Sequence, residues 1–166
     1  MSLALIMAKH ENADIDKVLK MALIHDITES RNGDVNYQSR LYVDKKEELA
    51  IDDILKSTSL EEEWKEIWNE YEERKSLESK IVKDADILDQ SLEKEEQAAK
   101  GNKEIKEVFK DTEKFYYYNL QTNDGKKIYG AMQSVGVHDW HVKGRNVYTE
   151  SDKSVFEGIK EKPRNN

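Results

Sequence analysis

The sequence is organised around the segment Leu23-Ile24-His25-Asp26-Ile27-Thr28-Glu29-Ser30-Arg31-Asn32-Gly33-Asp34. This segment places an imidazole, His25, beside a carboxylate, Asp26, after an apolar run with helical spacing. Two further carboxylates, Glu29 and Asp34, follow closely. A lone His-Asp pair is also typical of an ordinary helix C-terminus, because the helix dipole stabilises a cationic side chain there. The rest of the chain therefore decides between an ordinary helix end and a functional site.

The composition favours a helical protein of one domain. A chain of 166 residues has the length of one ordinary domain and can bury a hydrophobic core. Charged and hydrophobic residues each make up 37%, with one Pro and seven Gly, which favours long solvent-exposed helices over a β-sandwich or a barrel. The net charge of −8 argues against nucleic-acid binding, which needs a concentrated positive surface. A phosphorylated substrate would need a local cation, such as a metal ion, to offset the repulsion.

The chain has no cysteine, which excludes disulfides and thiolate metal sites and agrees with a cytoplasmic location. Its apolar start, Met1 to Ala8, lacks the basic flank and the cleavage site of a signal peptide. This stretch is also too short to span a bilayer. We therefore expect a cytoplasmic protein without membrane contact, and we read the first residues as a helix that has already begun.

Apolar residues at three- and four-residue spacing predict a series of helices. Asp14 is expected to cap a helix that runs to about Thr28, and Asn32-Gly33 is expected to end it. A later helix carries an aromatic stripe, Trp64, Ile67, Trp68 and Tyr71, which is read as core. The other expected helices span residues 45–56, 77 to about 100, a short stretch from 102, and 115–135.

A second polar segment lies within the helix predicted for residues 77–100, and it reads Lys83-Asp84-Ala85-Asp86-Ile87-Leu88-Asp89. Most of its three Asp side chains fit an ordinary solvated helix face. Asp86 is the strongest candidate for a function, because it lies between two apolar residues beside the most apolar stretch of the helix. The expected buried face of this helix consists of Ile81, Ala85, Leu88 and Leu92.

The two polar segments together have the chemistry of a metal site. If His25 and Asp26 converge with a carboxylate of the second segment, the nitrogen and oxygen donors suit Mn, Co, Ni, Zn, Fe or Mg. Such an ion would lower the pKa of a bound water and neutralise phosphoryl oxygens. Glu29 lies one helical turn from Asp26 and could orient or deprotonate that water. Asp34, beyond the turn, could contact a sugar hydroxyl or support the site.

The strings His25 to Asp34 and Val82 to Asp89 resemble those of the HD-domain metal-dependent phosphohydrolases, and most of all the 5'-deoxynucleotidase-like branch. The similarity runs over most of the chain, roughly from Ser2 to Trp140. It implies an all-α fold, a single HD-domain helical bundle over residues 1–143, followed by an irregular tail at 144–166. It also implies that the protein forms a homodimer.

The resemblance further implies a set of site residues. The metal ligands would be His25, Asp26 and Asp86, with Glu29 activating the water and Asp34 contacting the substrate. The reaction would be hydrolysis of a phosphomonoester by a metal-activated water. The partner would be a small phosphorylated molecule, with nucleoside 5'-monophosphates as the favoured class, and not a nucleic acid.

The sequence departs from the family pattern at its start. The family's metal site takes a fourth ligand, a His on the first helix, and Met1 to Ile6 resemble the residues just after that position. Two functions therefore stay open: an N-terminally shortened HD phosphohydrolase, or a catalytically impaired HD-fold module for binding or oligomerisation. The presence of Glu29, Asp34 and Asp86 favours the enzyme. With one ligand missing, we expect weak metal binding and slow turnover.

Overall fold

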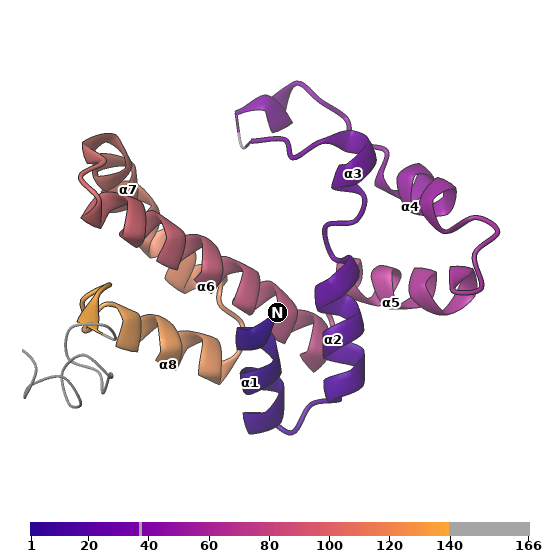
Figure 1. Ribbon diagram of the computed structural model, residues 1–166, viewed down its shortest axis with the longest axis horizontal. Helices are drawn as coiled ribbons and strands as arrows, with labels where there is room; N and C mark the ends of the chain where they lie inside the picture. Colours follow the sequence, from indigo (N-terminus) through magenta and orange to yellow (C-terminus); the bar gives the residue numbers. More distant parts are fainter. Residues whose placement is uncertain (37, 140–166) are drawn as a thin grey trace, which may run out of the picture.

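The computed structural model describes residues 1–36 and 38–139. All regular structure in these residues is helical, which confirms the all-α prediction (Figure 1). The tail expected at 144–166 lies outside the described residues. The helices are α1 (Ser2–His10), α2 (Ile15–Ile24), α3 (Glu29–Asn32), the 3-10 helix η1 (Ser39–Leu41), α4 (Glu47–Leu55), α5 (Glu61–Glu73), α6 (Leu77–Ala99), α7 (Lys103–Asn119) and α8 (Asn123–Met132).

The long helix α6 is the centre of the fold, because it contacts α1, α2, α5, α7 and α8. Figure 1 shows α2 and α5 toward one end of α6, with α3, η1 and α4 beyond the end of α2. The Ser76 side chain caps α6 by accepting a hydrogen bond from the Ser79 backbone N–H. Its predicted extent, Leu77 to about Lys100, is confirmed. Five helices thus bury their apolar faces against α6.

The buried face of α6 differs from the predicted one at its C-terminal end. Leu92 is 41% exposed, whereas Ser91 is completely buried. The cause is helical phase: Asp84, Leu88 and Ser91 stand at positions i, i+4 and i+7 and share one buried face. The aromatic stripe of α5 was predicted correctly, since Ile67, Trp68 and Tyr71 are buried and Trp64 packs against the core.

Helix α2 begins as predicted and ends earlier. The Asp14 side chain accepts a hydrogen bond from the Lys17 backbone N–H, so the predicted cap is confirmed. The helix stops at Ile24 rather than near Thr28, and a turn separates it from the short helix α3. Gly33, with φ +73°, ends α3. The early stop places His25 at the end of α2 instead of inside a continuous helix.

The last part of the described chain also departs from prediction. We expected one long helix at 115–135 after a short one, whereas α7 runs to Asn119 and α8 covers only Asn123–Met132. The break falls where the Thr122 side chain caps α8, accepting from the Gly125 N–H at 2.9 Å. Cap chemistry and contacts with α6 therefore outweigh the helical periodicity of this stretch.

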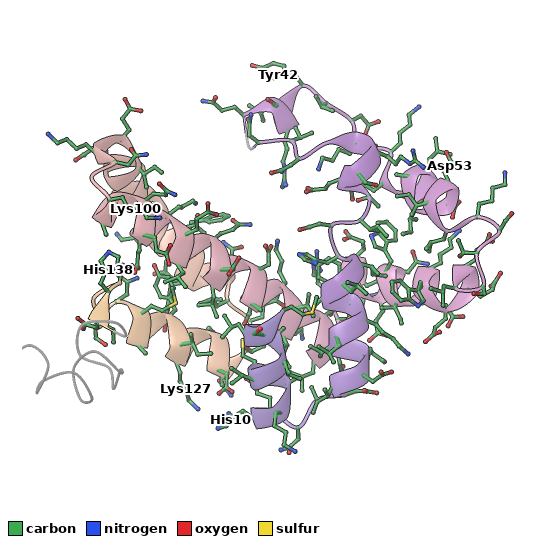
Figure 2. All side chains as sticks on the ribbon, in the orientation of Figure 1. His10, Tyr42, Asp53, Lys100, Lys127 and His138 are labelled. Carbon is green, nitrogen blue, oxygen red and sulfur yellow. The ribbon has the colours of Figure 1, made fainter. Side chains whose placement is uncertain are left out.

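The end of α1 is tied to the start of α8. His10 Nδ1 lies 2.5 Å from Asp124 Oδ2, and the Asp124 backbone N–H donates to Glu11 Oε1 at 2.9 Å. Figure 2 shows His10 and Lys127 near each other at this end of the molecule, with Tyr42 at the far tip of the segment that carries η1. Over residues 1–36 and 38–139, no helix is both apolar and long enough to cross a bilayer.

Candidate active site

The turn after α2, together with the segment before α4 and the end of α5, surrounds a pocket of about 340 Å³. Its acidic and aromatic lining includes His25, Asp26, Glu29 and Tyr71. Its basic lining consists of Arg40, Lys45, Arg74 and Lys83. The turn brings the polar groups into the pocket because α2 stops just before them. Three of the five residues proposed from the sequence thus line one cavity.

His25 is held from both sides. Its Nδ1 lies 3.1 Å from the Ala22 carbonyl oxygen, and its Nε2 lies 2.9 Å from Asp26 Oδ2. The ring also packs edge-on against Tyr71, with centroids 5.7 Å apart and an interplanar angle of 77°. Burial disfavours the imidazolium, but hydrogen bonds to Asp26 and Ala22 outweigh it, so the pKa of His25 is raised. In turn, the hydrogen bond with His25 lowers the pKa of Asp26.

Asp86 approaches this region from α6. Its Oδ2 accepts a hydrogen bond from Lys83 Nζ at 2.7 Å, and its Oδ1 accepts one from Gln90 Nε2 at 3.3 Å. The negative charge of Asp86 also contributes to the raised pKa of His25, which places the carboxylate within electrostatic range of the imidazole. The two carboxylates therefore each have a partner on the protein, since Asp26 contacts the His25 imidazole and Asp86 pairs with the Lys83 ammonium.

Glu29 stands at the start of α3 and faces the pocket. Its Oε1 accepts a hydrogen bond from Lys45 Nζ at 3.2 Å, which links α3 to the segment before α4. Asp34 lies beyond Gly33, is exposed, and is not part of the pocket wall in the described chain. The role predicted for Asp34 thus has no support from the pocket, whereas Glu29 is part of the pocket wall.

The donor chemistry of the site suits a divalent metal ion. His25, Asp26 and Asp86 supply one imidazole and two carboxylates, the donors preferred by borderline and hard divalent ions. Within residues 1–36 and 38–139, however, no three His, Asp or Glu side chains are gathered closely enough to hold a metal ion. The residues fit a metal by type, and their role as a ligand set stays a prediction.

Asp84 was expected on a solvated face, and this expectation is wrong. The side chain is completely buried and binds the junction between α7 and α8. Its Oδ2 accepts hydrogen bonds from the backbone N–H and the hydroxyl of Thr122, both at 2.7 Å, and its Oδ1 accepts one from the Gln121 N–H at 2.9 Å. Residues two apart on a helix point about 200° apart, so Asp84 and Asp86 face opposite sides of α6.

Arg74 and Lys45 belong to the pocket wall but were not proposed from the sequence. Arg74 follows the last residue of α5 in the left-handed conformation, with φ 54° and ψ 26°. The only signal in the sequence was the polar break that starts at Arg74. Such a break indicates where α5 ends, but it does not indicate where the guanidinium points.

Comparison with known proteins gives consistent results. A family model described as HD domain matches residues 1–123. The 5'-deoxynucleotidase HDDC2 of Dictyostelium discoideum is 32% identical over 90 residues, which are 50% of this chain and 47% of that protein. The proteins of the same name from Bos taurus and Homo sapiens are each 31% identical, over 108 residues (62% of this chain, 53% of that protein) and 101 residues (58% and 50%). The chain spans about half the length of the curated relatives it matches. No solved structure matches the chain.

Proposed function

Because the chain belongs to the HD-domain family, we propose that it is a phosphohydrolase that removes phosphate from nucleoside 5'-monophosphates. The observation that carries the proposal is the pocket in which the His25-Asp26 pair, Glu29 and several cations come together. The names of the curated relatives support the nucleotide as substrate. They also support the enzyme over the alternative, a catalytically impaired HD-fold module for binding or oligomerisation.

His25, Asp26 and Asp86 would hold the divalent metal ion expected for this family. When bound, such an ion supplies positive charge that acidifies a water and stabilises phosphoryl oxygens. Its identity among Mn, Co, Ni, Zn, Fe and Mg stays open, because the donor types accommodate all of them.

The residues of the chain itself would orient the reactants. In the reaction, a water oxygen attacks phosphorus, the ester P–O bond to the sugar breaks, and the nucleoside leaves with a proton. Glu29 is proposed to accept the proton of the attacking water, and Lys45 holds its carboxylate in position. Asp34 is proposed to contact a sugar hydroxyl. The four cations of the pocket balance the four acids of its lining, so the pocket repels a phosphate dianion less than the net charge of −8 would suggest.

The proposal is tested by phosphate release from a panel of ribo- and deoxynucleoside 5'-monophosphates, each with Mn, Co, Ni, Zn, Fe or Mg added. We expect release from at least one substrate and its loss when a chelator is added. Glu29→Gln should lower kcat by about 100-fold or more, as expected for a lost general base. Glu66→Gln, on the exposed surface of α5, is the matched control. If no substrate releases phosphate, the proposed phosphohydrolase activity is contradicted. A cytoplasmic location and a homodimer stay predictions.

A further inference from the structure

Four cations line the candidate pocket, and three of them donate a hydrogen bond to an acid or a carbonyl of the described chain. Lys45 Nζ donates to Glu29 at 3.2 Å, and Lys83 Nζ donates to Asp86 at 2.7 Å. The Arg40 Nε–H donates to the Val35 carbonyl at 3.0 Å. These side chains are therefore held by the acids and the backbone of the site.

Arg74 differs from the other three. Within the part of the chain that the structure describes, its Nη1 is buried and has no hydrogen-bond partner. Its Nη2 lies 3.6 Å from Glu72 Oε1, which is longer than a hydrogen bond. Burial raises the pKa of Glu72, and the positive charge of Arg74 partly offsets this effect. A buried N–H without an acceptor is unfavourable. The Arg74 side chain as a whole is 28% exposed and lines the pocket, so the guanidinium can also reach a ligand there.

The backbone of Arg74 points to the same conclusion. Its φ of 54° lies in the left-handed region, which Gly and Asn adopt at helix ends at little cost and other residues rarely adopt. An Arg in this position is not explained by local backbone preference. Such an outlier at a pocket supports a functional reason for the side chain.

Tyr71 fixes where the guanidinium lies. The Arg74 Cζ atom is 3.3 Å from the centroid of the Tyr71 ring, so the two planar groups stack. Tyr71 is buried, and its ring packs edge-on against His25. The stack therefore holds the guanidinium on the pocket wall that also carries the His25-Asp26 pair. Because the side chain is already restrained, it loses less conformational entropy when a ligand binds.

We infer that Arg74 binds the phosphate group of the substrate in the candidate pocket. The identity of that group rests on the proposed function, whereas the capacity to bind an oxyanion rests on a guanidinium that lines the pocket without a hydrogen bond at Nη1. A planar guanidinium can donate two parallel hydrogen bonds to two phosphate oxygens, which a lysine cannot do. Arg74 is thus assigned to substrate binding, and the acid-base step is left to Glu29.

The test uses inorganic phosphate as the probe, so that binding is measured without turnover. The full chain and the variants Arg74→Asn and Arg74→Gly are titrated by calorimetry, since both replacements tolerate a left-handed backbone. We expect phosphate binding to weaken by about ten-fold or more in both variants, as for the loss of a charge-assisted bidentate contact. Arg31→Asn removes the same charge from an exposed position outside the pocket and should leave binding unchanged. Thermal melting confirms that each variant is folded.

Kinetics separate the inference from the proposed function. If the chain releases phosphate, Arg74→Asn should raise KM for the nucleotide more than it lowers kcat, and Arg74→Lys should recover only part of the affinity. Unchanged phosphate affinity in folded Arg74 variants, or no phosphate binding by the unmodified chain, would overturn the inference. Arg74-dependent phosphate binding without any release would uphold the inference and contradict the proposed hydrolase.

Discussion

Asp84 and Thr122 are joined by two hydrogen bonds across the fold, one from the Thr122 hydroxyl and one from its backbone N–H, both 2.7 Å from Asp84 Oδ2. The same carboxylate also accepts from the Gln121 N–H. It is completely buried, so water cannot replace these bonds when they are lost. One side chain of α6 thus fixes both the end of α7 and the start of α8.

Removing this carboxylate should destabilise the protein strongly. Asp84→Ala leaves buried donors without an acceptor, and we expect the free energy of unfolding to fall by about 3 kcal/mol or more. Urea denaturation followed by circular dichroism measures the change. Asp89→Asn, on the exposed face of the same helix, is the control and should change stability by less than about 0.5 kcal/mol. A loss of under about 1 kcal/mol in Asp84→Ala would refute the anchoring role.

Two glycines of α8 should respond in opposite directions to the same substitution. A Cβ on Gly125 would lie 2.4 Å from Asp84 Oδ2, whereas a Cβ on Gly130 would meet nothing within 4 Å. Gly125→Ala should therefore destabilise the protein by about 1–3 kcal/mol. Gly130→Ala should stabilise it by about 0.5–1 kcal/mol, because Ala is the better helix former. Thermal melts of the two variants decide this, and equal shifts would show that the close approach at Gly125 is unimportant.

The His25-Asp26 pair should make stability depend on pH in the metal-free protein. The pKa of His25 is raised in the folded state, so the pair contributes stability that is fully present below the ordinary imidazole pKa. This contribution is lost as the pH rises through the folded-state pKa. The unmodified chain should therefore exceed His25→Asn in stability by more at about pH 5.5 than at about pH 8.5. The free energy of unfolding of both proteins is measured by urea denaturation with a chelator present. If the difference between them does not change with pH, the His25-Asp26 pair does not stabilise the fold in this way.

Metal binding should depend on the predicted ligands and not on the proposed base. His25→Asn and Asp86→Asn should each weaken binding of Mn or Co by about ten-fold or more, as measured by calorimetry. Glu29→Gln should leave that affinity nearly unchanged, because its predicted role needs no metal bond. If Asp86→Asn binds metal as tightly as the unmodified chain does, the ligand assignment is wrong.

Features with local causes were predictable from the sequence. The Asp14 cap was recognisable because its hydrogen bond is made within three residues, and α6 starts at the predicted residue, Leu77. The aromatic stripe of α5 was equally readable, because its spacing is that of one helix face. The His25-Asp26 pair and Glu29 also came from a single segment, and all three residues line the pocket.

Features with distant causes were not predictable. The burial of Asp84 depends on Gln121 and Thr122, which lie far along the chain, and so does the break between α7 and α8. Arg74 gains its place in the pocket from a left-handed backbone and a stack on Tyr71. No periodicity in the sequence encodes either of these, because they arise only when α6 has packed against the junction of α7 and α8 and when Arg74 lies on Tyr71.

The opposite orientation of Asp84 and Asp86 on α6 has a practical consequence. Because one helix carries both carboxylates, a change that loosens the Asp84 contacts with α8 would also loosen the helix that presents Asp86. Substitutions at Gly125, which does not line the pocket, are therefore expected to give temperature-sensitive variants, folded in cool cells and unfolded in warm ones. Such variants would lose the fold on warming while every residue of the pocket stays unchanged.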